Sequence, residues 1–236
     1  MKTIGPMKTI GMIGGLSWES SLIYYRLLNQ AVRERLGGLH SARILMHSVD
    51  FAEFEAIQRE GRWADGAQIL VDAARGLERA GASFVVLATN TMHRVAGEIE
   101  NNLNVPFLHI ADAAGRAVKA HGLSTVGLLG TRFTMEQDFY RLRLAARYDL
   151  NVLIPEEEDR ALIHDVIYNE LCLGQTREES KANFIAIIRR LIDSGAEGVI
   201  LGCTEIGMLI GPQDISVPSF DTTRTHVDAA VDLALA

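Results

Sequence analysis

The chain repeats itself, and this repeat constrains its fold more than any other feature. Three segments in the first half resemble three in the second half, at offsets of 116, 114 and 112 residues. The pairs are TIGMIGG from Thr9 with TVGLLGT from Thr125, GASFVVLATNT from Gly81 with GAEGVILGCTE from Gly195, and VPFLHI from Val105 with VPSFDT from Val217. Nearly constant offsets at three separate motifs predict two similar folding units, built in the same order.

Short apolar runs alternate with helical stretches almost throughout, which predicts βαβ units and mainly parallel sheets. The runs are continuously apolar, as is typical of strands buried on both faces. We expect strands at 9–15, 42–50, 83–90, 106–110, 125–131, 151–155, 198–204 and 217–222. The predicted fold class is α/β, with two pseudo-symmetric lobes, each an open mainly parallel sheet flanked by helices. Ligands bind beyond the carboxyl ends of such strands, so we expect the active site in the cleft between the lobes.

The repeat also suggests where the lobes begin and end. We assign 7–112 plus 212–236 to the first lobe and 113–211 to the second. The sequence MKTIG stands at 1–5 and again at 7–11, and only the second copy leads into a strand. Residues 1–6 are therefore interpreted as an N-terminal extension. Two long helical stretches end at Gly81 and Gly195, because glycine is a common helix stop.

Composition excludes several functional classes. No apolar run reaches the roughly 18–20 residues that a membrane span needs, so no membrane partner is expected. The net charge is −7 and no basic stripe is present, which argues against nucleic acid. No secretory signal is recognised, and two cysteines do not form a disulfide framework, so we expect a cytoplasmic protein. Scattered histidines without a ligand motif predict no metal site.

Cys203 follows an apolar strand and precedes a predicted helix, TEIGMLI. A thiol at a helix N-terminus has its thiolate stabilised by free N–H groups, so we expect a lowered pKa. The alternative is a buried, inert cysteine. The polar neighbours Thr204 and Glu205 favour a functional role, whereas Cys172, within an apolar helical stretch, is interpreted as packing.

The repeat pairs Cys203 with Thr89, because Gly195 pairs with Gly81. Asn90, Thr91 and His93 follow Thr89 and offer an amide, a hydroxyl and an imidazole. Asn90 or Thr91 could equally cap a helix, and His93 could be a surface histidine with satisfied hydrogen bonds.

The glycine-rich turns after the first strand of each repeat do not match a nucleotide-binding fingerprint. They favour tight turns that present N–H groups to a small carboxylate, near Gly15 and the hydroxyls of Ser17 and Thr131.

The stretches VVLATNTMH (85–93) and VILGCTEIG (199–207) resemble the two signature motifs of the aspartate/glutamate racemase family. IGMIGGLSWES, GLLGTRFTM and PFLHIAD also resemble that family, so the similarity spans nearly the whole chain. The resemblance implies a homodimer that forms a D-amino acid without a cofactor. It further implies two cysteines on opposite faces of the substrate α-carbon, one removing the α-proton and the other returning a proton.

This chain departs from that pattern at its first cysteine, where Thr89 stands. The expected catalytic residues are therefore Cys203, as principal acid and base, and Thr89. The expected substrate-binding and supporting residues are Gly15, Ser17, Gln58, Asn90, Thr91, Thr131 and Thr204, with His93 and Glu205 in support.

The substrate clamp departs as well. The arginine usual after the second strand is absent from HSVDFAEFEAIQREGRW, and Leu173 replaces a common lysine. Gln58, Arg59 or Arg62 could take over that contact, with Gln58 as the first choice.

Three function classes remain open. The first is an amino-acid racemase, an isomerase acting on aspartate and glutamate or broadly on neutral amino acids. The second is a one-cysteine decarboxylase or isomerase of the same superfamily. The third is a silent amino-acid-binding protein, which an intact GCTE motif disfavours.

Overall fold

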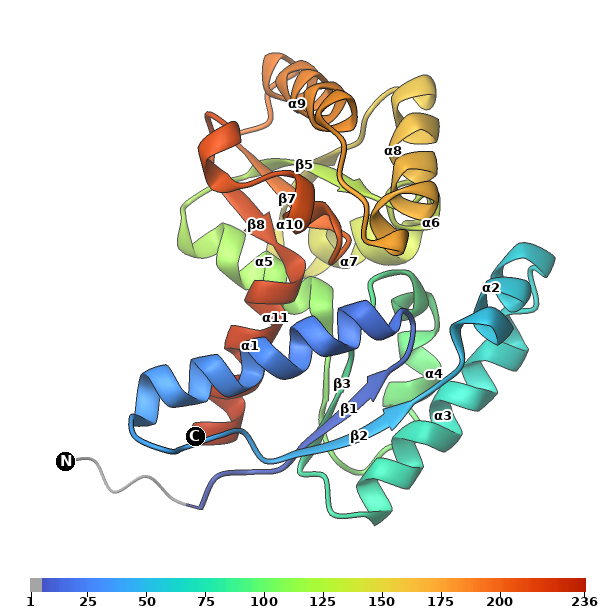
Figure 1. The fold of residues 1–236 in the computed structure, drawn as a ribbon, viewed down its shortest axis with the longest axis vertical. Helices are drawn as coiled ribbons and strands as arrows, with labels where there is room; N and C mark the ends of the chain where they lie inside the picture. The colour runs from blue at the N-terminus through green and yellow to red at the C-terminus, as the bar shows by residue number, and fades with distance from the viewer. Residues whose placement is uncertain (1–5) are drawn as a thin grey trace. The chain divides into compact units, whose positions relative to one another are not determined.

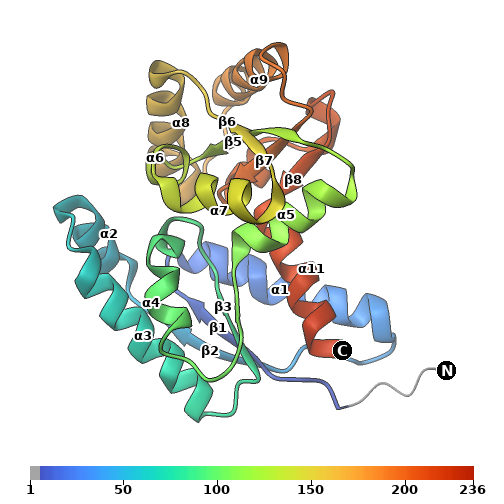
Figure 2. The same cartoon turned by 180° about the vertical axis from the view of Figure 1, so that it is seen from behind.

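The computed structural model describes residues 6–236, so nearly all of the predicted extension at 1–6 lies outside the described residues. The chain forms two compact units. The first runs to His109 and resumes from His226 to Ala236, and the second comprises Ile110–Thr225. Each unit contains a four-stranded sheet with helices on both faces (Figures 1 and 2).

The first unit has strand order β2-β1-β3-β4, and every neighbouring pair is parallel. Its elements are β1 (Ile10–Gly14), α1 (Trp18–Leu36), β2 (Ile44–Ser48), α2 (Phe51–Glu60), α3 (Trp63–Arg79), β3 (Phe84–Leu87), the 3₁₀ helix η1 (Thr91–Val95), α4 (Ala96–Glu100) and β4 (Phe107–Leu108). Most of α11 (Thr222–Leu235) also belongs to this unit.

The second unit has strand order β6-β5-β7-β8, again with parallel pairs. Its elements are α5 (Ile110–Ala120), β5 (Thr125–Gly130), α6 (Arg132–Glu136), α7 (Asp138–Tyr148), β6 (Asn151–Leu153), α8 (Glu157–Asn169), η2 (Leu171–Leu173), α9 (Glu178–Asp193), β7 (Gly198–Gly202), α10 (Ile206–Leu209), η3 (Pro212–Asp214) and β8 (Ser219–Asp221).

All eight predicted strands are present, and the two sheets share one topology. The predicted fold class, two similar parallel α/β units, is therefore confirmed. The unit boundaries differ from the predicted ones at the C-terminal side. Strand β8 pairs with β7, so the residues up to Thr225 group with the second unit, whereas the sequence suggested a return at 212.

The central strands β1, β3, β5 and β7 are buried almost throughout, which explains their continuously apolar sequences. In β1, Ile10 and Met12 pack against the helices α1 and α11, and Ile13 packs against α3. In β5, Val126 and Leu128 lie in one core cluster and Leu129 lies in the cluster that includes α9. Successive strand residues point to opposite faces, so a strand between two helical layers needs apolar side chains at nearly every position.

The repeat extends to helix–strand packing. A Cβ on Gly11 of β1 would lie 3.2 Å from Leu77 Cβ of α3, and a Cβ on Gly127 of β5 would lie 3.4 Å from Leu191 Cβ of α9. After both helices the chain turns through a glycine with positive φ, Gly81 or Gly195. Among residues 6–236, no helix combines the length and the apolar character needed to cross a bilayer.

Candidate active site

The chain leaves β7 through Cys203, Thr204 and Glu205 before it enters α10. Cys203 is half-buried, and the two residues after it are buried. The Cys203 thiol donates a hydrogen bond to Glu205 Oε2, with an Sγ–Oε2 distance of 2.9 Å. A nucleophilic sulfur and a buried carboxylate therefore meet at the carboxyl end of a central strand, where parallel α/β sheets bind ligands.

The pKa of Cys203 is raised well above its usual value, opposite to the direction that the sequence predicted. Burial is the largest cause, followed by the negative charge of Glu205 and by the proximity of Cys172. The predicted helix is also only four residues long as α10, so few aligned peptide dipoles face the sulfur. At neutral pH Cys203 is therefore a thiol and not a pre-formed thiolate.

The matching corner follows β3. Thr89 is half-buried, and its carbonyl oxygen accepts a hydrogen bond from His93 Nδ1 at 2.7 Å. His93 is buried beneath the corner and not on the surface, and its ring centroid lies 4.5 Å from that of His109. Asn90 stands at the N-cap of η1 without the predicted capping bond, and Thr91 is buried beside it. The corner thus carries a hydroxyl on a backbone fixed by a histidine.

The two corners occupy equivalent places in their sheets. Strand β3 lies between β1 and β4, and β7 lies between β5 and β8. The structure therefore supports the pairing of Thr89 with Cys203 that the repeat predicted. The side chains differ at the start of the loop that leaves each strand, where Thr89 follows β3 and Cys203 follows β7.

The turns after β1 and β5 use their polar groups mainly within the fold. Gly15 has φ of 90°, and a Cβ there would lie 2.1 Å from the Val49 carbonyl oxygen, so only glycine fits. Its N–H donates to Ser21 Oγ at 2.8 Å. Ser17 Oγ accepts from the N–H of Ser20, at 3.3 Å, and so caps α1.

Thr131 plays the same role in the second unit. Its Oγ1 accepts a hydrogen bond from the Thr134 N–H at 3.3 Å and caps α6. The carboxylate site predicted at these turns remains a prediction, because several of the groups it would use already have partners inside the protein.

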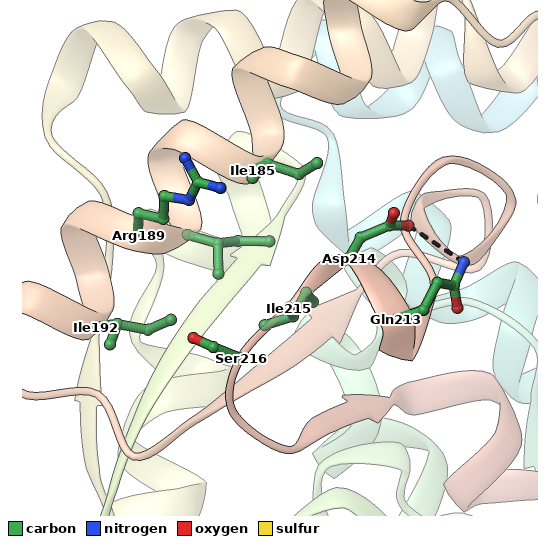
Figure 3. Close-up of a pocket in the computed structure, with 8 residues that line it drawn as sticks. Ile185, Arg189, Ile192, Gln213, Asp214, Ile215 and Ser216 are labelled. Atoms are coloured by element: carbon green, nitrogen blue, oxygen red, sulfur yellow. Dashed lines mark hydrogen bonds between the residues drawn. The ribbon is translucent and has the colours of Figure 1, made fainter.

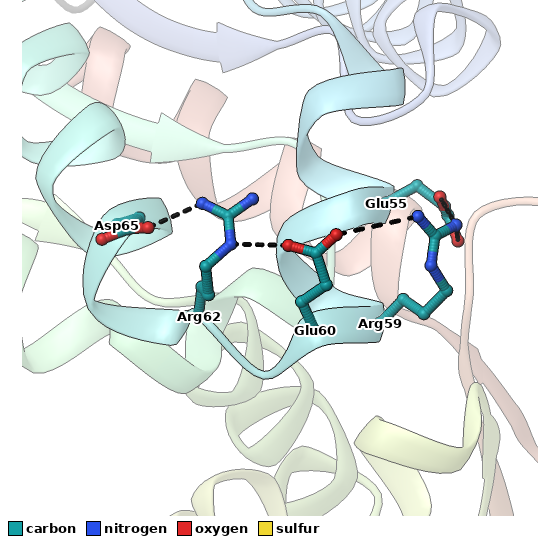
Figure 4. A network of polar contacts seen from close by, with 5 residues as sticks. All are labelled: Glu55, Arg59, Glu60, Arg62 and Asp65. Atoms are coloured by element: carbon teal, nitrogen blue, oxygen red, sulfur yellow. Dashed lines mark hydrogen bonds and ion pairs between the residues drawn. The ribbon is translucent and has the colours of Figure 1, made fainter.

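The proposed substitutes for the arginine clamp fall into two groups. Gln58 is buried in α2, and its Nε2 donates to the sulfur of Met92 in η1. Arg59 and Arg62 lie on the surface in a chain of ion pairs (Figure 4). Their partners are Glu55 for Arg59, and Glu60 and Asp65 for Arg62, each at 2.7 Å. Neither guanidinium is therefore free to meet a substrate carboxylate without breaking these pairs.

Other features lie apart from the predicted residues. Cys172 packs against the same core cluster as Cys203, as expected for a packing residue. A hollow of about 260 Å³ lies between α9 and the loop after η3 (Figure 3). Isoleucines and Arg189 line it, and none of the predicted site residues does. Within residues 6–236 no group of three or more potential ligands is arranged for a metal ion.

Sequence reasoning missed two residues, one that supports the turn after β1 and one that lies beside the Thr89 corner. Ser21 accepts a hydrogen bond from the Gly15 N–H, and its position four residues after Ser17 was the available signal. The His109 ring packs against His93 at an interplanar angle of 60°, and its place at the end of the predicted strand 106–110 was the corresponding signal.

The model of the Asp/Glu/Hydantoin racemase family matches residues 13–230. The chain belongs to this family. Among curated proteins, a glutamate racemase from Exiguobacterium sibiricum is 27% identical over 64% of this chain, and the match spans 58% of that protein's length. The broad specificity amino-acid racemase RacX from Bacillus subtilis is 24% identical over 71% of each chain.

Solved structures agree with this placement. A putative Asp/Glu racemase from Yersinia pestis is 50% identical, covers 98% of this chain and 100% of its own, and superposes with a TM-score of 0.92. An aspartate racemase homologue from Pyrococcus horikoshii is 36% identical over 97% of this chain and 99% of its own, with a TM-score of 0.86. Arylmalonate decarboxylase is 18% identical over 96% of this chain and 92% of its own, with a TM-score of 0.52, and shares the fold alone.

Proposed function

We propose that this family member racemises a free α-amino acid without a cofactor, by removing the α-proton from one face and returning a proton to the other. Membership of the Asp/Glu/Hydantoin racemase family supports the reaction class. The racemase names of the curated relatives support it further. Aspartate or glutamate is the first choice of substrate, and a broader range of neutral amino acids is the second.

One observation carries the mechanism: equivalent corners of a duplicated fold present Cys203 and Thr89. In the proposal both corners serve one substrate, with its α-carbon between them. Cys203 is the principal acid and base. Thr89 cannot ionise near neutral pH, so it orders a water or relays a proton on its own face. The reacting atoms must come within about 3–3.5 Å of the α-carbon for transfer.

The remaining predicted residues bind and support. We assign Gly15, Ser17, Thr131 and Thr204 to the ends of β1, β5 and β7, where they surround the bound amino acid. Asn90 and Thr91 join them at the Thr89 corner. Gln58 is assigned to the side-chain contact, and His93 holds the backbone that presents Thr89.

A one-cysteine decarboxylase is the alternative. The presence of cysteine at only one of the two corners favours it, since protonating a planar intermediate needs one acid. The fold shared with arylmalonate decarboxylase is compatible with that reaction.

The deciding experiment is α-proton exchange in deuterium oxide, followed by proton NMR for each enantiomer of a panel of amino acids. Loss of the α-proton signal, with inversion, is expected for acidic amino acids. Cys203→Ser should remove exchange while circular dichroism stays unchanged, and Cys172→Ser is the matched control that should keep it. Exchange retained in folded Cys203→Ser would exclude the assignment. Release of carbon dioxide from an arylmalonate without exchange of any amino acid would select the alternative.

The family resemblance also implies a homodimer that acts in the cytoplasm. Light scattering on the eluted protein tests the first part, since a dimer has twice the 25.9 kDa mass of the chain.

A further inference from the structure

We propose that the hollow between α9 and the segment after η3 binds a small aliphatic carboxylate, with the apolar chain on isoleucines and the carboxylate against Arg189 (Figure 3). The hollow lies within the second unit, and none of the residues assigned to the racemase reaction lines it. This binding is additional to the proposed function and does not depend on it. The competing explanation is a surface depression that holds only water.

The floor of the hollow is apolar because one face of α9 carries more isoleucine than the core covers. Residues three, four and seven positions apart share a helix face, and this face presents three isoleucines and Arg189 to the hollow. Ile188 is 2% exposed, whereas Ile185 and Ile192 are only partly buried. Ile215, on the opposite segment, is also partly buried against the same core cluster. Apolar surface therefore remains for a ligand to cover, and covering it is favourable.

Arg189 gives the hollow a positive charge that no described residue neutralises. Its side chain is exposed beside the isoleucines, and within residues 6–236 its guanidinium has no ion-pair partner. The neighbouring Arg190 differs, because it pairs with Asp159 at 2.6 Å. A guanidinium donates two parallel hydrogen bonds to a carboxylate, which makes a carboxylate the matching anion.

The carboxyl group of Asp214, on the side of the hollow opposite α9, already has its own partners (Figure 3). Its Oδ1 lies 2.9 Å from Lys181 Nζ. Its Oδ2 accepts hydrogen bonds from the Gly211 N–H at 2.9 Å and from Gln213 Nε2 at 3.4 Å. An ammonium group in the hollow would therefore meet no carboxylate free of partners. A plain carboxylate should bind better than an amino acid of the same chain length.

The size of the hollow limits the ligand to a short chain. Its volume is about 260 Å³, below the roughly 300–1,000 Å³ of pockets for drug-sized ligands. A chain of about four to six carbons suits such a space. Each methylene group that leaves water should tighten binding by about two- to fourfold. Affinity should therefore rise from butanoate through pentanoate to hexanoate.

Methyl NMR measures this binding and locates it. The full chain, labelled with carbon-13 at the isoleucine δ1 methyl groups, is titrated with the three acids and with 4-methylpentanoate at fixed pH and salt. Signals assigned with Ile185→Val, Ile192→Val and Ile215→Val should shift and saturate, with a Kd of about 1 mM for the six-carbon acids. Shifts that do not saturate, or that spread over exposed isoleucines elsewhere, would overturn the proposal.

Two further ligands test the chemistry of recognition. 4-Methylpentanamide keeps the chain of 4-methylpentanoate and loses the charge, and leucine adds an ammonium group to the same acid. Each should bind about fivefold more weakly than 4-methylpentanoate, since a surface ion pair contributes on this scale. Equal binding of the amide would show that the carboxylate is not recognised. Equal binding of leucine would make the hollow an amino-acid site, and either result would overturn the proposal.

Two arginine variants test the contact with the carboxylate. Arg189→Gln and Arg190→Gln each remove one positive charge from the same turn of α9, but only Arg189 lines the hollow. Arg189→Gln should weaken binding of 4-methylpentanoate about fivefold, whereas Arg190→Gln should leave it within about twofold of the parent. Equal losses in the two variants would show a general charge effect and would reject the assigned contact.

A third variant fills the hollow. Ser216 is exposed at its rim, so Ser216→Phe should occupy the space without disturbing the fold, and circular dichroism checks the fold. Saturable binding that persists in folded Ser216→Phe would place the ligand elsewhere and overturn the proposal.

The candidate active site is excluded with Cys203→Ser. Cys203 does not line the hollow, so this variant should bind 4-methylpentanoate as the parent does. Loss of binding in Cys203→Ser would place the acid at the β7 corner and reject the separate site. The titrations need no turnover, and α-proton exchange in deuterium oxide needs no added acid. Failure of the racemase proposal and failure of this one are therefore distinguishable.

Discussion

Cys203 and Thr89 stand at equivalent positions, but their side chains differ in what they do with a proton. The Cys203 sulfur lies within hydrogen-bond distance of the Glu205 carboxyl group, whereas the Thr89 hydroxyl does not ionise near neutral pH. His93 fixes the backbone of Thr89 through the carbonyl oxygen, so this contact does not use the Thr89 hydroxyl. In the proposed reaction the two faces of the substrate therefore meet groups of very unequal strength.

This inequality predicts unequal exchange. In deuterium oxide, the enantiomer whose α-hydrogen faces Cys203 should exchange quickly, and the other enantiomer slowly. Thr89→Ala should reduce inversion less than about tenfold if water is the real proton donor at that face. Thr89→Cys should speed the slow exchange most, because it restores a second thiol.

Proton NMR of each pure enantiomer measures these rates, with Cys203→Ser as the inactive reference. If Thr89→Ala lost exchange as completely as Cys203→Ser, the Thr89 hydroxyl itself would be indispensable.

At the scale of elements, a glycine makes close packing possible in each unit: Gly11 in β1 and Gly127 in β5. The space around the two glycines is not equally tight. A Cβ on Gly11 would lie 2.8 Å from Ala82 Cβ, which cannot rotate away. A Cβ on Gly127 would lie 2.9 Å from Leu191 Cδ1, the end of a flexible side chain. Overpacking should therefore cost more in the first unit.

We expect Gly11→Ala to lower the free energy of unfolding by about 2–3 kcal/mol. Gly127→Ala should lower it by less than about 1 kcal/mol, since a Leu191 rotamer change relieves the contact and alanine restricts the unfolded chain. Urea unfolding followed by circular dichroism measures both. Equal losses would show that helix α9 is held as rigidly as the neighbourhood of Ala82.

A second element-scale prediction concerns pH. His164 of α8 accepts the Arg132 N–H through Nδ1, at 3.3 Å, which requires a neutral ring. Burial and the positive charge of Arg132 lower its pKa from 6.5. The unfolded chain therefore binds the proton first as the pH falls, so stability should decrease below about pH 6.5.

His164→Gln removes this titration. The loss of stability between pH 7.5 and pH 5.5, measured by urea unfolding, should be smaller in the variant than in the parent. An unchanged slope would mean that other groups control the acid sensitivity of this region.

The same elements show how far sequence reasoning reached. The strands were predictable because burial on both faces leaves a continuous apolar run, and the repeat fixed which strand matches which. Two features were not. The helix after Cys203 ends after four residues as α10, and the pKa of the thiol depends on burial and on the orientation of Glu205. Both depend on tertiary packing, which cannot be read from the neighbouring residues in the sequence.

For the molecule as a whole, the unequal corners must still obey the thermodynamics of the proposed reaction. Two enantiomers have the same free energy in an achiral solvent, so kcat/KM must be the same in both directions. In an asymmetric site, kcat and KM can therefore differ between the two directions only by a common factor. We expect kcat and KM both to be larger in one direction than in the other, by the same factor. Thr89→Cys should change kcat/KM equally in the two directions, whatever it does to kcat alone.

Circular dichroism or chiral chromatography of full progress curves, started from each pure enantiomer, measures these quantities. Both curves should end at equal amounts of the two enantiomers. A reproducible end point away from equality, with enzyme still active, would mean that the net reaction is not a racemisation. Some further chemical step would then have to consume one enantiomer, and the decarboxylase and isomerase alternatives would return.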